Sequence, residues 1–137
     1  MHLQLRRGEF DQEARDALAR AAAFDTTGGL VTLEELLAAG ALFELVDDGG
    51  GVRVRYVLRQ VEHAHGAEVI VTAAASDPRA GFDATRIGMA AIMAQAQAAG
   101  ASTVAVHTRR NGLLRKLARL GFSLDGFILR KRVRPCD

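Results

Sequence analysis

The sequence is 137 residues long, 49% of them hydrophobic and 25% charged, with a formal net charge of +2. This length and composition predict a single globular domain, residues 1–137, large enough to bury a core without disulfide bonds. The lone cysteine, Cys136, excludes a disulfide framework and a cysteine metal site, and with no apolar signal-peptide stretch at the start we expect a cytoplasmic protein.

The first 40 residues predict one short strand and two helices. The stretch "HLQLRR" alternates apolar and polar residues, as a half-buried strand does. Asp11–Phe24 is predicted to be a helix, and its acidic first turn suits the helix dipole. Thr32 then begins a second helix, with Glu35 at the capping-box position and Gly40 as the stop.

The middle of the chain, residues 41–76, is predicted to be β structure. Residues 41–48 predict a strand, and the glycines at 49–51 predict a hairpin turn. Residues 52–65 alternate apolar side chains with arginines, which is typical of a half-buried antiparallel strand. The next strand, "AEVIVTAAAS", is nearly all apolar, which indicates a central position with both faces covered.

Residues 87–106 carry no charge over 20 positions, which is long enough to raise the question of a membrane span. However, Gly100 interrupts the stretch, and Gln95 and Gln97 lie inside it. We therefore predict a buried helix over Asp83–Ala99, a short buried strand in "STVAVHT", and no membrane partner.

The C-terminal part begins with a cationic helix, in which leucines recur at helical spacing between residues 111 and 120. Gly121 ends this helix because glycine tolerates the left-handed conformation, and Phe122 is placed to pack back onto the last turn. The following "GFSLDGFILRKRV" predicts two short strands around Asp125 and Gly126.

The predicted order of elements is β-α-α-β-β-β-α-β-α-β-β. It indicates an α+β domain with a mixed sheet, whose last strand–helix–strand unit is parallel and right-handed. No repeat or low-complexity linker interrupts the order, which agrees with a single domain.

This order, together with "VAVHT…N…LLRKLARLGF", resembles the GNAT superfamily of acyl-CoA-dependent N-acetyltransferases. The arrangement matches over the whole chain, whereas the residue-level likeness is confined to residues 103–133. The resemblance implies a mostly antiparallel sheet with a central splay. It also implies direct transfer of an acetyl group from acetyl-CoA to a primary amine of a small molecule or peptide, without a metal.

The resemblance further implies where acetyl-CoA would bind, between the strands "AEVIVTAAA" and "STVAVHT". Backbone amides of Val71, Thr72 and Ala73 would hold the pantetheine and the acyl carbonyl. The pyrophosphate would lie on the amides that open the next helix, where unpaired N–H groups and the helix dipole favour an anion. The remaining candidates for cofactor binding are Arg79, Thr85, Arg86, Gly88, Ala90 and Asn111.

The phosphate loop departs from the family pattern, Arg/Gln-x-x-Gly-x-Gly/Ala. In "TRIGMA", Gly88 and Ala90 fit the last two positions, but Thr85 replaces the Arg or Gln. Asp83 would also bring a carboxylate toward the phosphate, at a cost on the order of 1 kcal/mol unless an arginine neutralises it. A helix merely capped by Asp83 is the alternative interpretation.

The helix that contains Leu117 also departs from the family pattern. Leu117 stands where the family often has a tyrosine that protonates the leaving thiolate, and the only tyrosine, Tyr56, lies on the arginine-rich strand. Asn111 matches an asparagine often found near the start of this helix, but it is equally consistent with a helix cap.

Acetyl transfer to an amine requires a group that removes a proton from the ammonium, and histidine titrates near neutral pH. His107 follows a strand at the end where sites gather in α/β proteins, and Glu68 opens the presumed central strand. We take these two as the candidate catalytic residues. The "EHAH" stretch around His63 and His65 offers further acid–base groups, but too few ligands for a zinc site.

Charge is unevenly distributed along the chain. Residues 1–83 carry 8 Lys or Arg and 14 Asp or Glu, a net charge of −6, whereas residues 84–137 carry 10 and 2, a net charge of +8. The basic half favours an anionic partner or a solvated basic face. The alternative function is therefore a catalytically degenerate GNAT-fold module that binds protein or nucleic acid, although no aromatic residue is interleaved for base stacking. The sequence also leaves the oligomeric state open, and a homo-oligomer could form through strand edges.

Overall fold

The computed structural model describes residues 2–22, 30–77 and 83–134. Arg79, one of the residues expected to bind the cofactor, lies outside them. The described elements, in chain order, are β1 (Gln4–Arg7), α1 (Gln12–Ala22), α2 (Leu33–Ala38), β2 (Ala41–Val46), β3 (Val52–His63), β4 (Gly66–Ser76), α3 (Ala84–Ala98), β5 (Thr103–Val106) and α4 (Asn111–Arg119).

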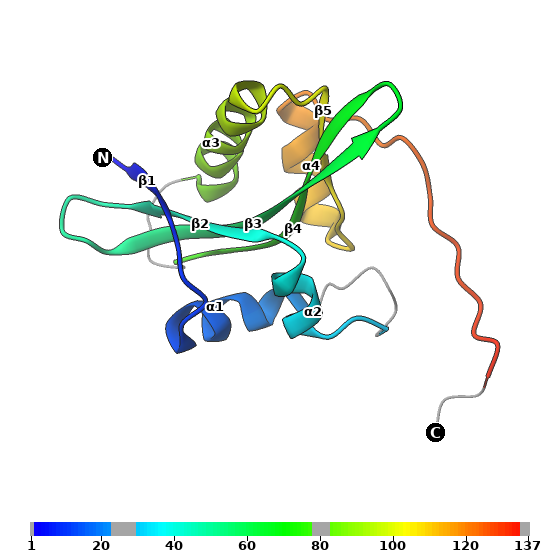
Figure 1. The fold of residues 1–137 in the computed structure, drawn as a ribbon, viewed down its shortest axis with the longest axis horizontal. Helices are drawn as coiled ribbons and strands as arrows, with labels where there is room; N and C mark the ends of the chain where they lie inside the picture. Colours follow the sequence, from blue (N-terminus) through cyan, green and yellow to red (C-terminus); the bar gives the residue numbers. More distant parts are fainter. Residues whose placement is uncertain (1, 23–29, 78–82, 135–137) are drawn as a thin grey trace.

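The five strands form one sheet in the order β1-β2-β3-β4-β5. The first three pairings are antiparallel, and β4 pairs with β5 in parallel. The prediction of an α+β domain with a mixed, mostly antiparallel sheet is therefore confirmed. The prediction that the last strand–helix–strand unit is parallel is wrong, because no strand follows α4 within the described residues and the parallel unit is β4, α3 and β5. Figure 1 shows α3 and α4 on one face of the sheet and α1 and α2 on the other.

Each face of the sheet has its own hydrophobic core. On one face, Tyr56, Met89 and Leu117 belong to a cluster contributed by β2, β3, β4, α3 and α4. On the other face, Leu18 and Leu37 pack on a cluster that includes strand residues of β2, β3 and β4. β3 and β4 contribute residues to both clusters, so the two faces of these strands are both covered. This confirms the prediction that β4 lies inside the sheet with both faces covered.

The face of β3 that carries arginines is partly buried, although its alternating pattern predicts a face exposed to solvent. Glu44 on β2 is only 6% exposed, and its carboxylate accepts from Arg55 at 3.1 Å and from Arg6 at 3.0 Å. Arg55 also pairs with Glu13 on α1 at 3.0 Å. The charged side chains on this face thus pair with one another beneath α1. Because buried charges cost little when they are paired and hydrogen-bonded, a helix can cover this strand face.

The turn between β2 and β3 is organised by Asp47. One carboxylate oxygen accepts from the backbone N–H of Gly49 at 3.0 Å and of Gly51 at 2.8 Å, and the other pairs with Arg53 at 2.7 Å. Gly50 adopts φ +84°, which glycine does without strain. The glycine run therefore makes the predicted hairpin, with an aspartate as its anchor.

Replacing Asp47 with asparagine is expected to destabilise the fold at neutral pH and only weakly in acid. The backbone N–H of Gly51, with the Arg53 guanidinium, lowers the pKa of Asp47 below its ordinary 3.8. A carboxyl whose pKa is lower in the folded state contributes stability at pH values above its pKa in the unfolded state. This stability is lost as the pH falls through its pKa in the folded state. Urea unfolding should show a difference between wild type and Asp47→Asn at pH 7 that shrinks below about pH 4, with Asp48→Asn as the exposed control. A difference independent of pH would contradict this account.

Helix α4 ends as its sequence predicts. Gly121 has φ +93°, its N–H bonds the carbonyl of Ala118 at 3.1 Å, and the N–H of Phe122 bonds the carbonyl of Leu117 at 3.1 Å. These two bonds are those of a Schellman motif, and Phe122 packs against the same core cluster as Leu117.

The two strands predicted around Asp125 and Gly126 are wrong for this structure. Residues 122–132 have no regular secondary structure, and residues 123–134 are all exposed. Figure 1 shows this segment leaving the end of α4 and running away from the body of the protein. A strand needs a neighbour to satisfy its backbone, and these residues have no strand partner within the described chain.

Candidate functional site

The parallel pairing of β4 and β5 ends at Val71 and Val106, whereas β4 continues to Ser76. Beyond that point β4 pairs only with β3 among the described strands, so one edge of residues 72–76 is open. Thr72 lies at the irregularity in this pairing, since Val71 and Ala73 are matched to successive β3 residues while Thr72 has no match. Such a bulge redirects side chains and ends pairing, and bulges are common beside active sites. The splay predicted between these strands is thus present.

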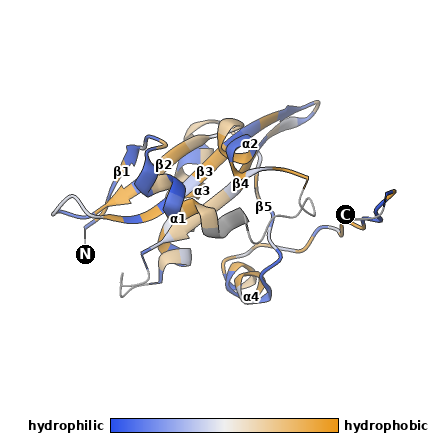
Figure 2. Cartoon of the chain, turned by 90° about the horizontal axis from the view of Figure 1, so that it is seen from below, coloured by the Kyte–Doolittle hydropathy of each residue, from blue (hydrophilic) through white to orange (hydrophobic). Residues whose placement is uncertain are grey.

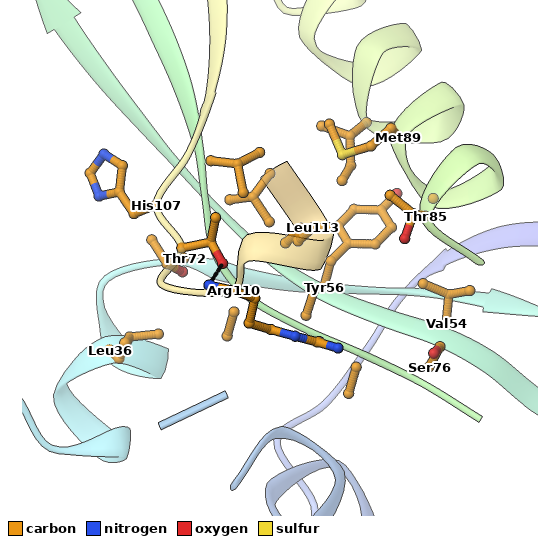
Figure 3. A pocket seen from close by; sticks show the side chains of 18 of the residues that line it. Leu36, Val54, Tyr56, Thr72, Ser76, Thr85, Met89, His107, Arg110 and Leu113 are labelled. Atoms are coloured by element: carbon orange, nitrogen blue, oxygen red, sulfur yellow. Dashed lines mark hydrogen bonds between the residues drawn. The ribbon is translucent and has the colours of Figure 1, made fainter. Parts of the chain in front are cut away.

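A cavity of about 470 Å³ opens at this splay. It is lined by residues of β3 and β4, of α2, α3 and α4, and of the segment that joins β5 to α4. Figure 3 shows Thr72 and His107 toward one end, and Met89 and Thr85 toward the other. Most of the lining is apolar or small, which suits a pocket that holds an organic ligand and orients it with few polar groups.

Six of the predicted site residues line the cavity: Val71, Thr72, Ala73, Thr85, Gly88 and His107. They come from β4, α3 and the residue after β5, and the tertiary structure brings them around one space. His107 directly follows β5, as Thr72 follows the last paired residue of β4, so the two flank the opening of the splay.

The other described candidates lie elsewhere. Glu68 is outside the lining, and its carboxylate accepts from Thr103 at 2.9 Å across the β4–β5 pair. Arg86 and Ala90 are exposed residues of α3 that do not line the cavity. Asn111 is exposed and is the first residue of α4. The interpretation of Asn111 as the helix cap is wrong, because the cap residue is Arg110.

The start of α3 is capped as the sequence predicts. The Asp83 carboxylate accepts from the backbone N–H of Arg86 at 3.2 Å. Asp83 is exposed and is not part of the cavity lining, whereas Ala84, Thr85 and Gly88 are. Helix α3 therefore turns small residues toward the cavity while its capping carboxylate stays outside the lining. A β-carbon added to Gly88 would meet Val54 at an ordinary 3.5 Å.

The cavity also contains polar residues that the sequence patterns did not single out as site residues. Glu35 on α2, Arg59 on β3 and Arg110 before α4 all line it. The sequence pattern predicts only a helix-capping role for Glu35, and the Thr32 hydroxyl does accept from the backbone N–H of Glu35 at 3.1 Å. These residues are 24 or more positions apart in sequence. No local pattern links them, so only the fold reveals that they share a pocket.

Tyr56 is another lining residue, and it is fully buried. Its hydroxyl donates a hydrogen bond to the side-chain carbonyl of Gln95 on α3, and burial raises its pKa. The ring stacks on Phe43 with 6.0 Å between centroids. Tyr56 therefore ties the sheet to α3 beneath the cavity.

Changing Tyr56 to phenylalanine is expected to reduce the free energy of unfolding by about 1 kcal/mol, because the Gln95 carbonyl loses its donor. Adding Gln95→Leu should restore part of that loss, since removing both partners leaves no polar group to satisfy. Urea unfolding of the single and double variants measures both effects. An unchanged stability in Tyr56→Phe would show that the bond contributes nothing net.

Within residues 2–22, 30–77 and 83–134, no three His, Cys, Asp or Glu side chains lie together as a metal site would require. None of the helices described there is both long and apolar enough to span a bilayer.

Comparison with solved structures gives likeness in fold over nearly the whole chain. A glucosamine-6-phosphate N-acetyltransferase from Arabidopsis thaliana matches with a TM-score of 0.63 and 12% identity, covering 98% of this chain and 100% of that one. A candidate acetyltransferase from Pyrococcus furiosus matches with a TM-score of 0.71 and 13% identity, covering 96% and 100%. A mutant of the protein TTHA1254 from Thermus thermophilus has a TM-score of 0.58 and 26% identity, covering 96% and 99%.

No family model matches the sequence, and no curated protein matches it. The likeness therefore resides in the arrangement of helices and strands, and it shows that the chain has the GNAT fold.

Proposed function

We propose that this GNAT-fold chain is an N-acetyltransferase that moves an acetyl group from acetyl-CoA to a primary amine by direct transfer. One observation supports this above all: β4 runs past the end of β5 and exposes an open edge to a cavity. An open strand edge presents backbone N–H and C=O groups to whatever lies beside it. The amide-rich pantetheine arm of CoA is a ligand that can pair with such an edge.

The residues around the splay fit acetyl-CoA in shape and chemistry. Backbone groups of Thr72 and Ala73, beside the bulge, would hold the pantetheine and polarise the thioester carbonyl. The first turn of α3, with Thr85 and Gly88 in the lining, would receive the pyrophosphate at its N–H groups. The Asp83 carboxylate already accepts from the backbone N–H of Arg86, so the pyrophosphate would bind the N–H groups of Ala84 and Thr85 instead.

Acetyl-CoA supplies an activated acyl group, and the chain must supply orientation and a proton acceptor. His107 is exposed at the cavity wall, where its imidazole would take a proton from the acceptor ammonium, directly or through one water. The amine nitrogen then bonds to the acyl carbon, the C–S bond breaks, and the thiol leaves with a proton. Glu68 lies outside the cavity lining, so this proposal assigns the base to His107 alone.

No tyrosine is placed to protonate the leaving thiolate within the described residues. Leu117 occupies that helix position, is 4% exposed and belongs to the core. The Tyr56 hydroxyl is engaged with Gln95. We expect the proton held by His107 to pass to the sulfur through water. The second proton, which the nitrogen loses once it is bonded to the acyl carbon, then returns to His107 and leaves to solvent, so that the reaction balances without a second protein acid.

The direct test is thermal unfolding with and without acetyl-CoA. A ligand present at 100 times its Kd stabilises the native state by about 2.7 kcal/mol, which is roughly 10 °C in a domain of this size. Release of free thiol with a panel of primary amines then reports transfer. No change in Tm at millimolar acetyl-CoA would reject the enzyme, and would leave the degenerate binding module. Salt-sensitive retention on DNA would then identify nucleic acid as its partner.

A further inference from the structure

Two oppositely charged side chains line the cavity and have no partner within the described residues. Glu35 on α2 and Arg59 on β3 are both exposed residues of the lining. Among the described residues, neither the Glu35 carboxylate nor the Arg59 guanidinium forms a salt bridge or a hydrogen bond. Two other arginines of β3 differ, because Arg53 and Arg55 each pair with a carboxylate, at 2.7 Å and 3.1 Å. The charges of Glu35 and Arg59 are therefore available to a ligand.

Glu35 and Arg59 both lie on the α2 side of the sheet. Val57 belongs to the core cluster that α1 and α2 cover, and Arg59 follows it at the two-residue period of a strand, so both project from one face. The end of α2 touches the same part of β3, since a β-carbon added to Gly40 would lie 2.7 Å from the carbonyl oxygen of the residue before Arg59. Figures 1 and 2 show α2 beside β3 and β4 from two directions.

This side of the cavity is also the end that contains the proposed base. Figure 3 shows His107, Thr72 and Leu36 of α2 toward one end of the cavity, and Thr85 toward the other. Thr85 belongs to the first turn of α3, where the pyrophosphate is proposed to bind. The cofactor would therefore enter from the α3 end with its thioester near Thr72, which leaves the α2 end for the acceptor amine.

We infer that the acceptor is an amino acid, whose carboxylate pairs with Arg59 and whose ammonium pairs with Glu35. The inference names the acceptor of the transferase proposed above and rests on that function. One positive and one negative side chain complement a zwitterion, and a guanidinium can bind a carboxylate through two parallel hydrogen bonds. A polyamine would instead bring cations toward Arg59, and a phosphorylated amine would bring a double negative charge toward Glu35.

The rest of this end favours an apolar amino acid. Val31, Leu36 and Ala39 line the cavity beside Glu35. Among the described residues of the lining, α2 and β3 contribute no charge other than Glu35 and Arg59. A charged acceptor side chain would lose water there without gaining a partner. We therefore expect leucine and methionine to be better acceptors than glutamate or lysine.

Transfer to an amino acid balances with the residues already assigned. Glu35 holds the ammonium while His107 takes its first proton, the nitrogen bonds to the acyl carbon, and the C–S bond breaks. The proton on His107 passes to the sulfur, and the second proton of the nitrogen leaves to solvent through His107. The product is an N-acetyl amino acid, which has no ammonium to pair with Glu35, so its release is favoured.

Thiol release with leucine and with leucinamide tests the role of Arg59, because leucinamide has the same ammonium and side chain but no carboxylate. We expect the ratio of kcat/KM for leucine to that for leucinamide to fall about 10- to 100-fold in Arg59→Met, which is the usual range for a hydrogen bond to a charged group. Comparing this ratio between variants cancels the different intrinsic reactivities of the two amines. Arg119→Met is the matched control, since Arg119 is an exposed arginine of α4 outside the lining and should leave the ratio unchanged.

The variant Glu35→Gln tests the other half of the site. It should lower kcat/KM for leucine and leucinamide by similar factors, because both amines carry the ammonium that Glu35 would hold. Glu34→Gln is the control on the same helix, since the Glu34 carboxylate pairs with Arg15 and is not in the lining. Unchanged rates in Glu35→Gln would overturn the inference.

Three further results would overturn it. An equal loss with leucine and leucinamide in Arg59→Met would show that Arg59 does not bind the carboxylate. Faster turnover of O-phosphoethanolamine than of any amino acid would place a phosphate at Arg59. A rise in Tm with acetyl-CoA but no turnover of any amino acid would leave the transferase with another class of acceptor. Failure of the proposed function is distinguishable from all of these, because acetyl-CoA would then leave the Tm unchanged and reject transferase and acceptor together.

Discussion

Tryptophan in place of Ala74 is expected to abolish the stabilisation of this protein by acetyl-CoA. Ala74 is exposed, lines the cavity and lies on β4 beyond the last pair with β5. It is in register with Tyr56, so its β-carbon points to the same face of the sheet as that ring. An indole would occupy space beside the open edge, where the proposed ligand lies, without displacing core atoms.

The measurement is the Tm with and without millimolar acetyl-CoA. The rise of roughly 10 °C expected for the wild type at 100 times Kd should vanish in Ala74→Trp, while the Tm without ligand stays close to that of the wild type. Ala94→Trp is the matched control, because Ala94 is exposed on α3 and is not in the cavity lining. A full shift in Ala74→Trp would mean that the ligand does not use the splay.

Alanine in place of His107 is expected to lower kcat by roughly 10²- to 10⁴-fold, the usual contribution of a positioned general base. The expected effect on acetyl-CoA binding is small, because the proposed contacts to the cofactor come from β4 and α3. The combination of retained thermal stabilisation and lost turnover would therefore separate proton transfer from binding.

The matched control for this prediction is His65→Ala. His65 is exposed in the turn between β3 and β4 and does not line the cavity, so its replacement should leave kcat unchanged. Equal rates in the His107 and His65 variants would remove His107 from the mechanism. In that case Glu35, whose carboxylate also belongs to the lining, would be the next residue to test.

Local chemistry was sufficient to predict most elements. Thr32 and Asp83 cap their helices with the side-chain bonds that their positions predict, and Gly121 adopts the left-handed conformation that ends α4. The glycine run makes the β2–β3 turn. These features depend on a few neighbouring residues, and for that reason a single sequence contains enough information to place them.

The candidate site was only partly predictable. The resemblance indicated the stretch around Thr72, and the position of His107 directly after a strand indicated an acid–base role; both residues line the cavity. Glu35, Arg59 and Arg110 reach the same cavity from α2, β3 and the start of α4. Their meeting depends on how the helices pack on the sheet, which no spacing along the chain encodes.

The sequence by itself determined the nature and order of the elements, because alternation, capping residues and glycine positions act over a few residues at a time. Only the tertiary structure decided where β5 stops against β4, which side chains surround the resulting cavity, and that residues 122–132 form no strand in the described chain. The physical reason is that strand pairing and pocket formation are long-range. A backbone N–H or an apolar side chain carries the same local signal whether its partner is present or not, and the partner is chosen only when the whole chain packs.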